Sequence, residues 1–329
     1  MPKQYLKVPN LRFAFQEEWN NDVFQNIVIN RKEKYNPTTS SNDFKCIELD
    51  SLSQNTGELL ITYNSKDQKS IKSKFYLNDV LYGKLRPYLR KYYHPMFDGV
   101  CSSEIWVFSS KILDPLFLYQ YIQTSNFNEL ANISSGSKMP RADWAVISDS
   151  LIYYPNKDEM KKIGYFLSLL DQRIQTQNKI IEEKRLLKNL IIDKIFFKSN
   201  TDFVPLSSLI NLKNGYAFKS DCYSNSDGYK VITIGNVSGD RYLDLKKFNC
   251  ISILPIDIQE HQILKRGDLL ISLTGNVGRV SICNESNCVL NQRVGLIEFF
   301  DEDDKEYIYQ IMSSKRFQND MISRAQGAA

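Results

Sequence analysis

Apolar residues recur at helical spacing through the centre of the chain, from residue 156 to about residue 198. They fall three or four positions apart, or at sums of these steps, which places them on one face of a helix: Ile163, Leu167, Leu170, Ile174, Ile181, Leu187, Ile191 and Ile195. Asn156, three residues before Glu159, is typical of a helix N-cap with a capping-box partner. The pattern predicts a helix of roughly 40 residues, about 60 Å long.

A long helix with a narrow apolar stripe is expected to pack against a partner helix, which removes the stripe from water. Gln177, Lys184 and Lys188 fall where a strict heptad would place apolar residues, so the pattern indicates an imperfect coiled coil. The alternative is a long amphipathic helix that lies on its own domain.

The segments on either side of the helix alternate apolar and polar residues over short lengths. Runs such as CIELD, GVCSSEIWVF, YKVITIGNV, GDLLISLTG and VLNQRVGLIEF predict strands bounded by turn residues. Helical spacing predicts shorter helices at 115–131 and 304–324. The expected fold is therefore α+β, with a domain at 1–155, a helical spacer at 156–198 and a second domain at 199–329.

The two flanking domains resemble each other. FKCIEL at 44–49 aligns with YKVITI at 229–234, NDVLYGKL at 78–85 with GDLLISLT at 267–274, and residues 119–137 with residues 309–327. This repeat is too long for a solenoid unit. It predicts two similar mixed α/β domains, joined by the central helix, with two similar sites.

Composition narrows the class of protein. The 329 residues suffice for two domains with their own cores, and 42% apolar with 24% charged residues is ordinary for a globular protein. Six cysteines without a C-x-x-C pair, and only His94 and His261, argue against a zinc site. No secretory signal and no apolar run of membrane length are present. We therefore expect a soluble cytoplasmic protein with reduced cysteines and no association with a membrane.

Motifs for catalysis and cofactor binding are missing from the chain. It contains no phosphate-binding loop, dinucleotide fingerprint, nucleophile elbow or H-E-x-x-H pair. Asn36-Pro37 is followed by Thr38, not by the proline and aromatic residue of an amino-methyltransferase, so it predicts a turn. Candidates for catalytic chemistry are therefore few, and a stand-alone methyltransferase or nuclease is disfavoured.

Cations gather in a few segments, although the net charge of +4 is small. Residues 72–93 interleave lysine and arginine with tyrosine, and the loop SSGSKMPRADW adds two more cations. In the second domain the matching stretches are SLTGNVGRV and LNQRV. Such side chains can neutralise phosphates or bond to base edges. A solvated strand face, a surface turn or amides bonded to the local backbone would give the same pattern.

At the level of motif order, the chain resembles the specificity (S) subunit of type I restriction-modification enzymes. The resemblance rests on IGYFLSLLDQRIQTQNKIIEEKRLLKNLIIDKIFF, on GDLLISLTGNVGRV followed by VLNQRVGLIEF, and on GKLRPYLRKYY followed by GVCSSEIWVF and SSGSKMPRADW. It implies two target recognition domains, each reading one half of a split sequence in double-stranded DNA. It also implies a helical spacer that sets the gap between half-sites and docks modification (M) subunits, two in number.

The resemblance implies that this chain is not an enzyme, binds no cofactor of its own and leaves the chemistry to other chains. S-adenosylmethionine, ATP and Mg are expected on partner subunits, which include the restriction (R) subunits. By position, the expected DNA-facing residues are Lys84, Arg86, Arg90, Lys91, Lys138 and Arg141 in the first domain, and Thr274, Asn276, Arg279, Asn291 and Arg293 in the second.

Relatives of this kind continue with a second helical region, which is absent after residue 329 here. We expect the central helix to expose apolar surface that self-association, another chain or M subunits would cover. The alternative function is a non-catalytic coiled-coil scaffold that binds protein. DNA binding would weaken steeply with salt, whereas a scaffold would not bind DNA in that way.

Overall fold

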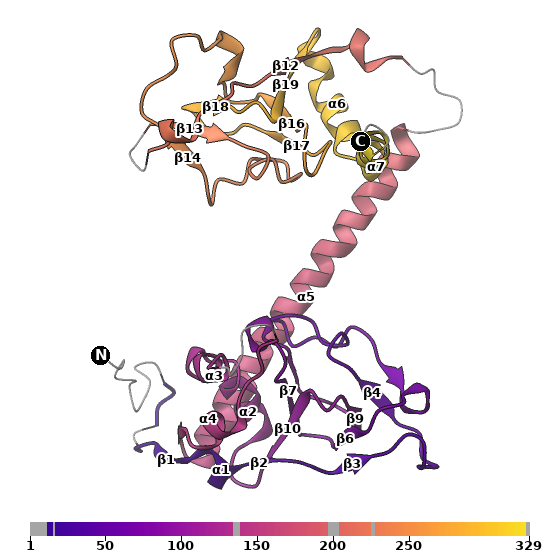
Figure 1. Cartoon of the computed structure of the whole chain (residues 1–329), viewed down its shortest axis with the longest axis vertical. Coiled ribbons are helices and arrows are strands. Elements are labelled where there is room, and N and C mark those ends of the chain that lie inside the picture. The colour runs from indigo at the N-terminus through magenta and orange to yellow at the C-terminus, as the bar shows by residue number, and fades with distance from the viewer. Residues whose placement is uncertain (1–11, 16, 134–138, 197–203, 225–227, 327–329) are drawn as a thin grey trace. The chain divides into compact units, whose positions relative to one another are not determined.

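The computed structural model describes residues 12–15, 17–133, 139–196, 204–224 and 228–326. Its contacts divide the chain into unit 1 (Met1–Gln177) and unit 2 (Asn178–Ala329). The predicted central helix is α5 (Lys157–Phe196), and the division between the units falls inside it (Figure 1). The expected α+β class, with a long helix between two domains, is confirmed.

Two sheets form the body of unit 1, with strand orders β2-β10-β7-β8 and β3-β6-β9-β4-β5. Their strands are β2 (Val28–Asn30), β3 (Lys34–Tyr35), β4 (Lys45–Ile47), β5 (Tyr63–Asn64), β6 (Lys72–Phe75), β7 (Val80–Gly83), β8 (Tyr92–Tyr93), β9 (Gly99–Cys101) and β10 (Ile105–Ser110). A separate ribbon pairs β1 (Asn20–Val23) with β11 (Leu151–Tyr154).

The first sheet of unit 1 is buried on both faces because successive side chains of a strand point to opposite sides. Tyr82 and Phe108 pack among the helices, whereas Leu81 and Val107 pack against the second sheet. The short helices are α1 (Phe24–Ile27), α2 (Pro115–Tyr121), α3 (Ser125–Ala131) and α4 (Trp144–Ser148). Unit 1 therefore has three layers, which are helices, sheet and sheet.

Unit 2 repeats the strand orders of unit 1, except that its second sheet has no described counterpart of β3. Its sheets have the orders β12-β19-β16-β17 and β14-β13-β18-β15. The strands are β12 (Ile210–Asn214), β13 (Tyr229–Ile232), β14 (Asn249–Ile251), β15 (Ile263–Leu264), β16 (Leu269–Ser272), β17 (Val280–Ile282), β18 (Cys288–Leu290) and β19 (Val294–Phe299). Each unit has one parallel pair, β4 with β9 and β13 with β18, among its described strands. The predicted duplication is confirmed.

Each of the two shorter predicted helices is in fact a pair of helices. Residues 115–131 form α2 and α3, and the second domain has α6 (Lys305–Met312) and α7 (Lys315–Gln326). Thr124 Oγ1 accepts the Phe127 N–H at 3.3 Å, and Ser314 Oγ accepts the Phe317 N–H at 3.2 Å. These hydroxyl caps begin a new helix at equivalent points of the repeat. The spacing of apolar residues does not register so short a break.

Helix α5 begins as predicted, because Asn156 Oδ1 accepts the Glu159 N–H at 2.9 Å. The capping-box partner differs, since both Glu159 carboxylate oxygens accept bonds from Arg12, at 2.9 and 2.5 Å. Met160 and Ile192 are buried, the first in unit 1 and the second in unit 2. Ile163 packs against the unit 1 core, and the stripe is exposed from Leu170 to Ile191, with Ile174 and Leu187 at 59% and 49%.

Candidate nucleic-acid interface

The connection between β7 and β8 in unit 1 is a tight turn that carries most of the predicted cations. Arg86 and Arg90 have left-handed backbone conformations, with φ of 52° and 49°, on either side of the 3₁₀ turn Pro87–Leu89. The Arg86 N–H donates to Pro140 O at 2.8 Å, and the Ala142 N–H donates to Lys84 O at 2.8 Å. The structure thus brings the backbone of Lys84 and Arg86 next to that of Arg141.

The predicted cations of unit 1 differ in their partners. Arg90 Nη2 donates to Gln123 O at 2.7 Å, and Lys91 Nζ donates to Leu49 O at 2.5 Å, so both side chains hold the turn to the fold. Arg141 donates two hydrogen bonds to the Glu104 carboxylate, from Nε at 3.1 Å and from Nη2 at 3.3 Å. Arg86 is exposed and Lys84 is partly buried, and no ion pair of the described residues engages either. Lys138 lies outside the described residues.

The matching turn of unit 2 joins β16 to β17. Gly275 and Gly278 adopt positive φ of 69° and 84°, where a side chain would be strained. Ser272 Oγ accepts the Arg279 N–H at 3.1 Å and donates to Asn276 O at 2.5 Å, which closes the turn. Thr274 and Asn276 are exposed at its tip. The Arg279 side chain is partly buried, with its stem over Gly239.

A second turn, between β18 and β19, lies against the first. The Leu273 N–H donates to Arg293 O at 3.0 Å, which joins the two turns. Asn291 is 9% exposed and its Oδ1 accepts the Arg293 N–H at 3.3 Å, so this amide stabilises the turn. Arg293 and Gln292 are exposed. Thr274, Asn276 and Arg293 therefore share one surface, to which the sequence analysis had not assigned Gln292.

The two units build this surface with the same backbone bonds. Lys84 N–H donates to Glu104 O at 2.9 Å in unit 1, as Leu273 N–H donates to Arg293 O in unit 2. Gly83 N–H likewise donates to Lys91 O at 2.8 Å, and Ser272 N–H to Arg279 O at 2.9 Å. We call the surface formed by residues 84–91, 104 and 139–142 the unit 1 turn surface, and that formed by residues 273–279 and 291–293 the unit 2 turn surface.

Tyrosines near the unit 1 turn surface divide by burial. Tyr82 and Tyr92 lie in the core, and burial raises the pKa of each above the ordinary value, which keeps the phenols neutral. Tyr76 is tied to Glu33, and that hydrogen bond raises the pKa of Tyr76. Tyr88 is 56% exposed between the two left-handed arginines. Of these four tyrosines, Tyr88 is the most exposed.

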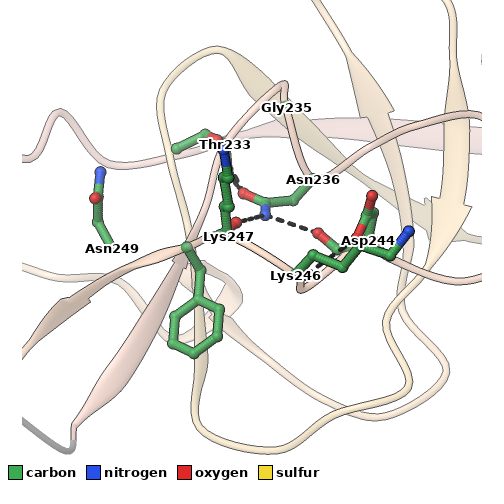
Figure 2. Close-up of a pocket in the computed structure, with 8 residues that line it drawn as sticks. Thr233, Gly235, Asn236, Asp244, Lys246, Lys247 and Asn249 are labelled. Atoms are coloured by element: carbon green, nitrogen blue, oxygen red, sulfur yellow. Dashed lines mark hydrogen bonds between the residues drawn. The ribbon is translucent and has the colours of Figure 1, made fainter. Parts of the chain in front are cut away.

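A hollow of about 530 Å³ lies in unit 2 and is lined by the segment from Thr233 to Asn249 (Figure 2). At its floor, Asn236 is 3% exposed and donates to Asp244 O at 2.9 Å and Lys247 O at 2.8 Å. Its Oδ1 accepts the Thr233 N–H at 2.9 Å. These bonds use the amide within the fold. The loop between β13 and β14 lines this hollow and carries Lys246 and Lys247.

Within the described ranges, no three histidine, cysteine, aspartate or glutamate side chains cluster as metal ligands do. The helices of those ranges include none with both the length and the apolar character of a membrane span. The arrangement can offer charge, amides and an exposed tyrosine to a polyanion.

A sequence model of the family described as Type I restriction modification DNA specificity domain matches residues 20–183 and 198–328. The MjaVIII type I restriction enzyme specificity subunit of Methanocaldococcus jannaschii is 26% identical over 239 residues, which are 64% of this chain and 55% of that protein. The EcoDI specificity subunit of Escherichia coli is 34% identical over 95 residues, 29% of this chain and 21% of the relative. The chain thus spans about half the length, or less, of these curated relatives.

Solved structures show the same fold. The S subunit of a type I restriction-modification system from M. genitalium has a TM-score of 0.61 at 14% identity, over 97% of this chain and 82% of that chain. A chain from a study of complex assembly and conformational transition in the type I system has a TM-score of 0.51 at 16% identity, over 91% of this chain and 80% of that chain.

Proposed function

The chain belongs to the family of type I restriction-modification DNA specificity domains, and on this premise we propose that it reads DNA sequence for a type I restriction-modification enzyme without catalysing a reaction. Each unit reads one half of a bipartite target in double-stranded DNA. Helix α5 sets the spacing of the half-sites and docks M subunits, through which R subunits join. The methyl donor, ATP and Mg belong to those partners, and the complex works in the cytoplasm.

The observation that carries this proposal is a turn surface built twice on one backbone pattern with different side chains. Equivalent bonds fix residues 84–91 in unit 1 and 273–279 in unit 2. The side chains they present are Arg86 and Tyr88 in the first and Thr274 and Asn276 in the second. A constant frame with variable tips suits two readers of unlike half-sites, because base edges are distinguished by side-chain chemistry.

In unit 1, Arg86 and Lys84 supply charge for phosphates or guanine edges. Arg141 contributes when DNA competes with Glu104 for its guanidinium, and Lys138 belongs to the same proposed set. Arg90 and Lys91 hold the turn in place through Gln123 O and Leu49 O. Their proposed role in DNA binding is therefore indirect.

In unit 2, Arg293, Asn276 and Thr274 are the proposed direct contacts, and Arg279 is adjacent to them. Arginine bonds to guanine O6 and N7, and asparagine or glutamine bonds to adenine N6 and N7. Gln292 can perform the second role, since the Asn291 amide is occupied by the Arg293 N–H. Asn291 shapes the turn.

Methylome sequencing of cells that carry this chain with its M subunit tests the proposal. The expected result is one methylated motif with two specified parts and a fixed gap. Replacing Arg86 and Lys84 together by alanine should change one part, and replacing Arg293 should change the other. A wild-type complex that methylates no split motif, or that binds duplex DNA with an affinity independent of salt, would contradict the proposal and favour the protein scaffold.

A further inference from the structure

The loop between β14 and β15 of unit 2 exposes two isoleucine side chains to solvent. Ile253 is 84% exposed and Ile256 is 107% exposed. Leu254 and Ile258, on the same loop, pack inward with Val231 and its neighbours in the second sheet. Contact between large aliphatic side chains and water is unfavourable, so full exposure of two on one short loop calls for a partner that covers them.

The fold itself does not require these isoleucines. The equivalent loop of unit 1 joins β5 to β6 and runs only from residue 65 to residue 71, whereas the unit 2 loop runs from residue 252 to residue 262. The unit 1 loop reads SKDQKSI, and its one aliphatic residue, Ile71, is 54% exposed. The same topology therefore forms with a shorter loop that exposes a single aliphatic residue, and the turn with Ile253 and Ile256 is an addition to unit 2.

The loop is held in one conformation. The Ile258 N–H donates to Pro255 O at 3.2 Å, which closes a turn, and proline restricts the backbone at that turn. Asp257 Oδ1 accepts the Tyr216 hydroxyl at 2.8 Å. Because inward packing and these bonds fix the backbone, Ile253 and Ile256 are presented with little conformational freedom left to lose on binding.

The anchor of the loop leads directly to the unit 2 turn surface. The Tyr216 N–H donates to Leu290 O at 2.8 Å, and Tyr216 O accepts the Gln292 N–H at 2.9 Å. Gln292 is exposed beside Arg293. The same tyrosine thus binds the isoleucine loop through its hydroxyl and the turn with Gln292 and Arg293 through its backbone.

We propose that Ile253 and Ile256 contact the C5 methyl groups of thymine in the half-site bound by unit 2, an inference that rests on the proposed function. Thymine alone among the four unmodified bases carries a methyl group in the major groove. An aliphatic side chain has no hydrogen-bonding atoms and senses a base edge only through such a group. The isoleucines complement Gln292 and Arg293, which read polar edges.

Deoxyuridine in place of thymidine provides the test, because it removes the methyl group and leaves the hydrogen-bonding edge intact. The probe is a DNA duplex that contains the motif identified by methylome sequencing. Its binding to the complete complex with M subunits is measured. The wild-type complex should bind about fourfold more weakly for each methyl removed from one half-site, the effect of one buried CH₂ group. In the double variant Ile253→Ala and Ile256→Ala, thymidine and deoxyuridine duplexes should bind equally.

Ile29→Ala is the matched control, because Ile29 is 51% exposed on strand β2 of unit 1. This variant should keep the wild-type preference for thymidine. The proposal is overturned if the wild-type complex ignores the substitution in both half-sites, if the double variant keeps the preference, or if the half-site altered by Arg293→Ala contains no A·T pair. Loss of M-subunit binding in the double variant, with the thymidine preference retained, would assign the loop to a protein partner.

Failure of this inference is distinct from failure of the proposed function. A wild-type complex that methylates a split motif but is indifferent to deoxyuridine keeps the function and loses the role of the isoleucines. A wild-type complex without a split motif loses both.

Discussion

Glu104 and Arg293 occupy the same position in the two units and carry opposite charges. The Glu104 carbonyl accepts the Lys84 N–H at 2.9 Å, and the Arg293 carbonyl accepts the Leu273 N–H at 3.0 Å. The Glu104 carboxylate holds Arg141, whereas Arg293 is exposed. An acid at one site and a base at the other give the two turn surfaces different electrostatics on one backbone frame.

Glu104→Gln should strengthen the binding of duplex DNA. The substitution removes a negative charge from the unit 1 turn surface and releases Arg141. An additional phosphate contact should steepen the plot of log affinity against log salt by about 0.9. Fluorescence anisotropy across a salt series measures this slope. Glu182→Gln, which breaks an exposed pair with Arg185 on α5, is the control and should leave the slope unchanged.

Arg86→Ala and Arg90→Ala should have different effects although both arginines lie on one turn. Arg86 is exposed, so its loss should lower the salt slope by about 0.9 with a change in stability below about 0.5 kcal/mol. Arg90 bonds to Gln123 O, and its loss should lower the free energy of unfolding by about 2 kcal/mol. Equal salt slopes for the two variants at equal stability would refute this separation.

Arg293→Ala should relax one half-site only. A bidentate arginine contact discriminates between bases by about 1–3 kcal/mol, so methylation should spread to motifs that differ at one position. Asn291→Ala should instead destabilise unit 2, because the Asn291 Oδ1 accepts the Arg293 N–H within the turn. Methylome sequencing and denaturant unfolding of both variants separate the two roles. Relaxation of both half-sites by Arg293→Ala would contradict the assignment.

Asn236→Ala should lower the free energy of unfolding of unit 2 by about 3 kcal/mol, because three backbone partners of this buried amide lose their bond. Amide hydrogen exchange should quicken in β13 and β14, which flank the loop. Asn249→Ala is the control, since Asn249 is exposed at the rim of the same hollow. Comparable loss of stability in both variants would show that the hydrogen bonds of Asn236 are not the cause.

Acid should destabilise unit 1 through His94. Burial lowers the pKa of His94, and its Nε2 has no hydrogen-bond partner in the described part of the chain. The unfolded chain therefore binds this proton at a higher pH than the folded chain does. Stability should be constant above about pH 7 and should fall as the pH drops through about 6.5, the ordinary value for histidine.

His94→Gln should remove this part of the pH dependence, measured as the free energy of unfolding between pH 7.5 and pH 5.5, a window chosen from the ordinary histidine value of about 6.5. His261→Gln, in unit 2, should leave it in place. A pH profile of unit 1 that is the same in His94→Gln and wild type would exclude His94 as its source.

The sequence by itself determined the duplication, the central helix and its Asn156 cap. Periodic apolar residues and repeated segments can be recognised from the order of residues alone, because neither depends on which residues are in contact in the fold. The sequence also identified the segments that form the two turn surfaces, because glycines, cations and amides gather there.

Only the tertiary structure decided which of those side chains face outward. Backbone groups form hydrogen bonds with the side chains of Arg90, Lys91 and Asn291. Arg141 is paired with Glu104, which lies 37 residues away in the sequence. The sequence did not indicate that Ile253 and Ile256 are exposed, because an aliphatic residue is by default expected to lie in the core. Burial and pairing depend on residues that are distant along the chain and meet only when the sheets and helices pack.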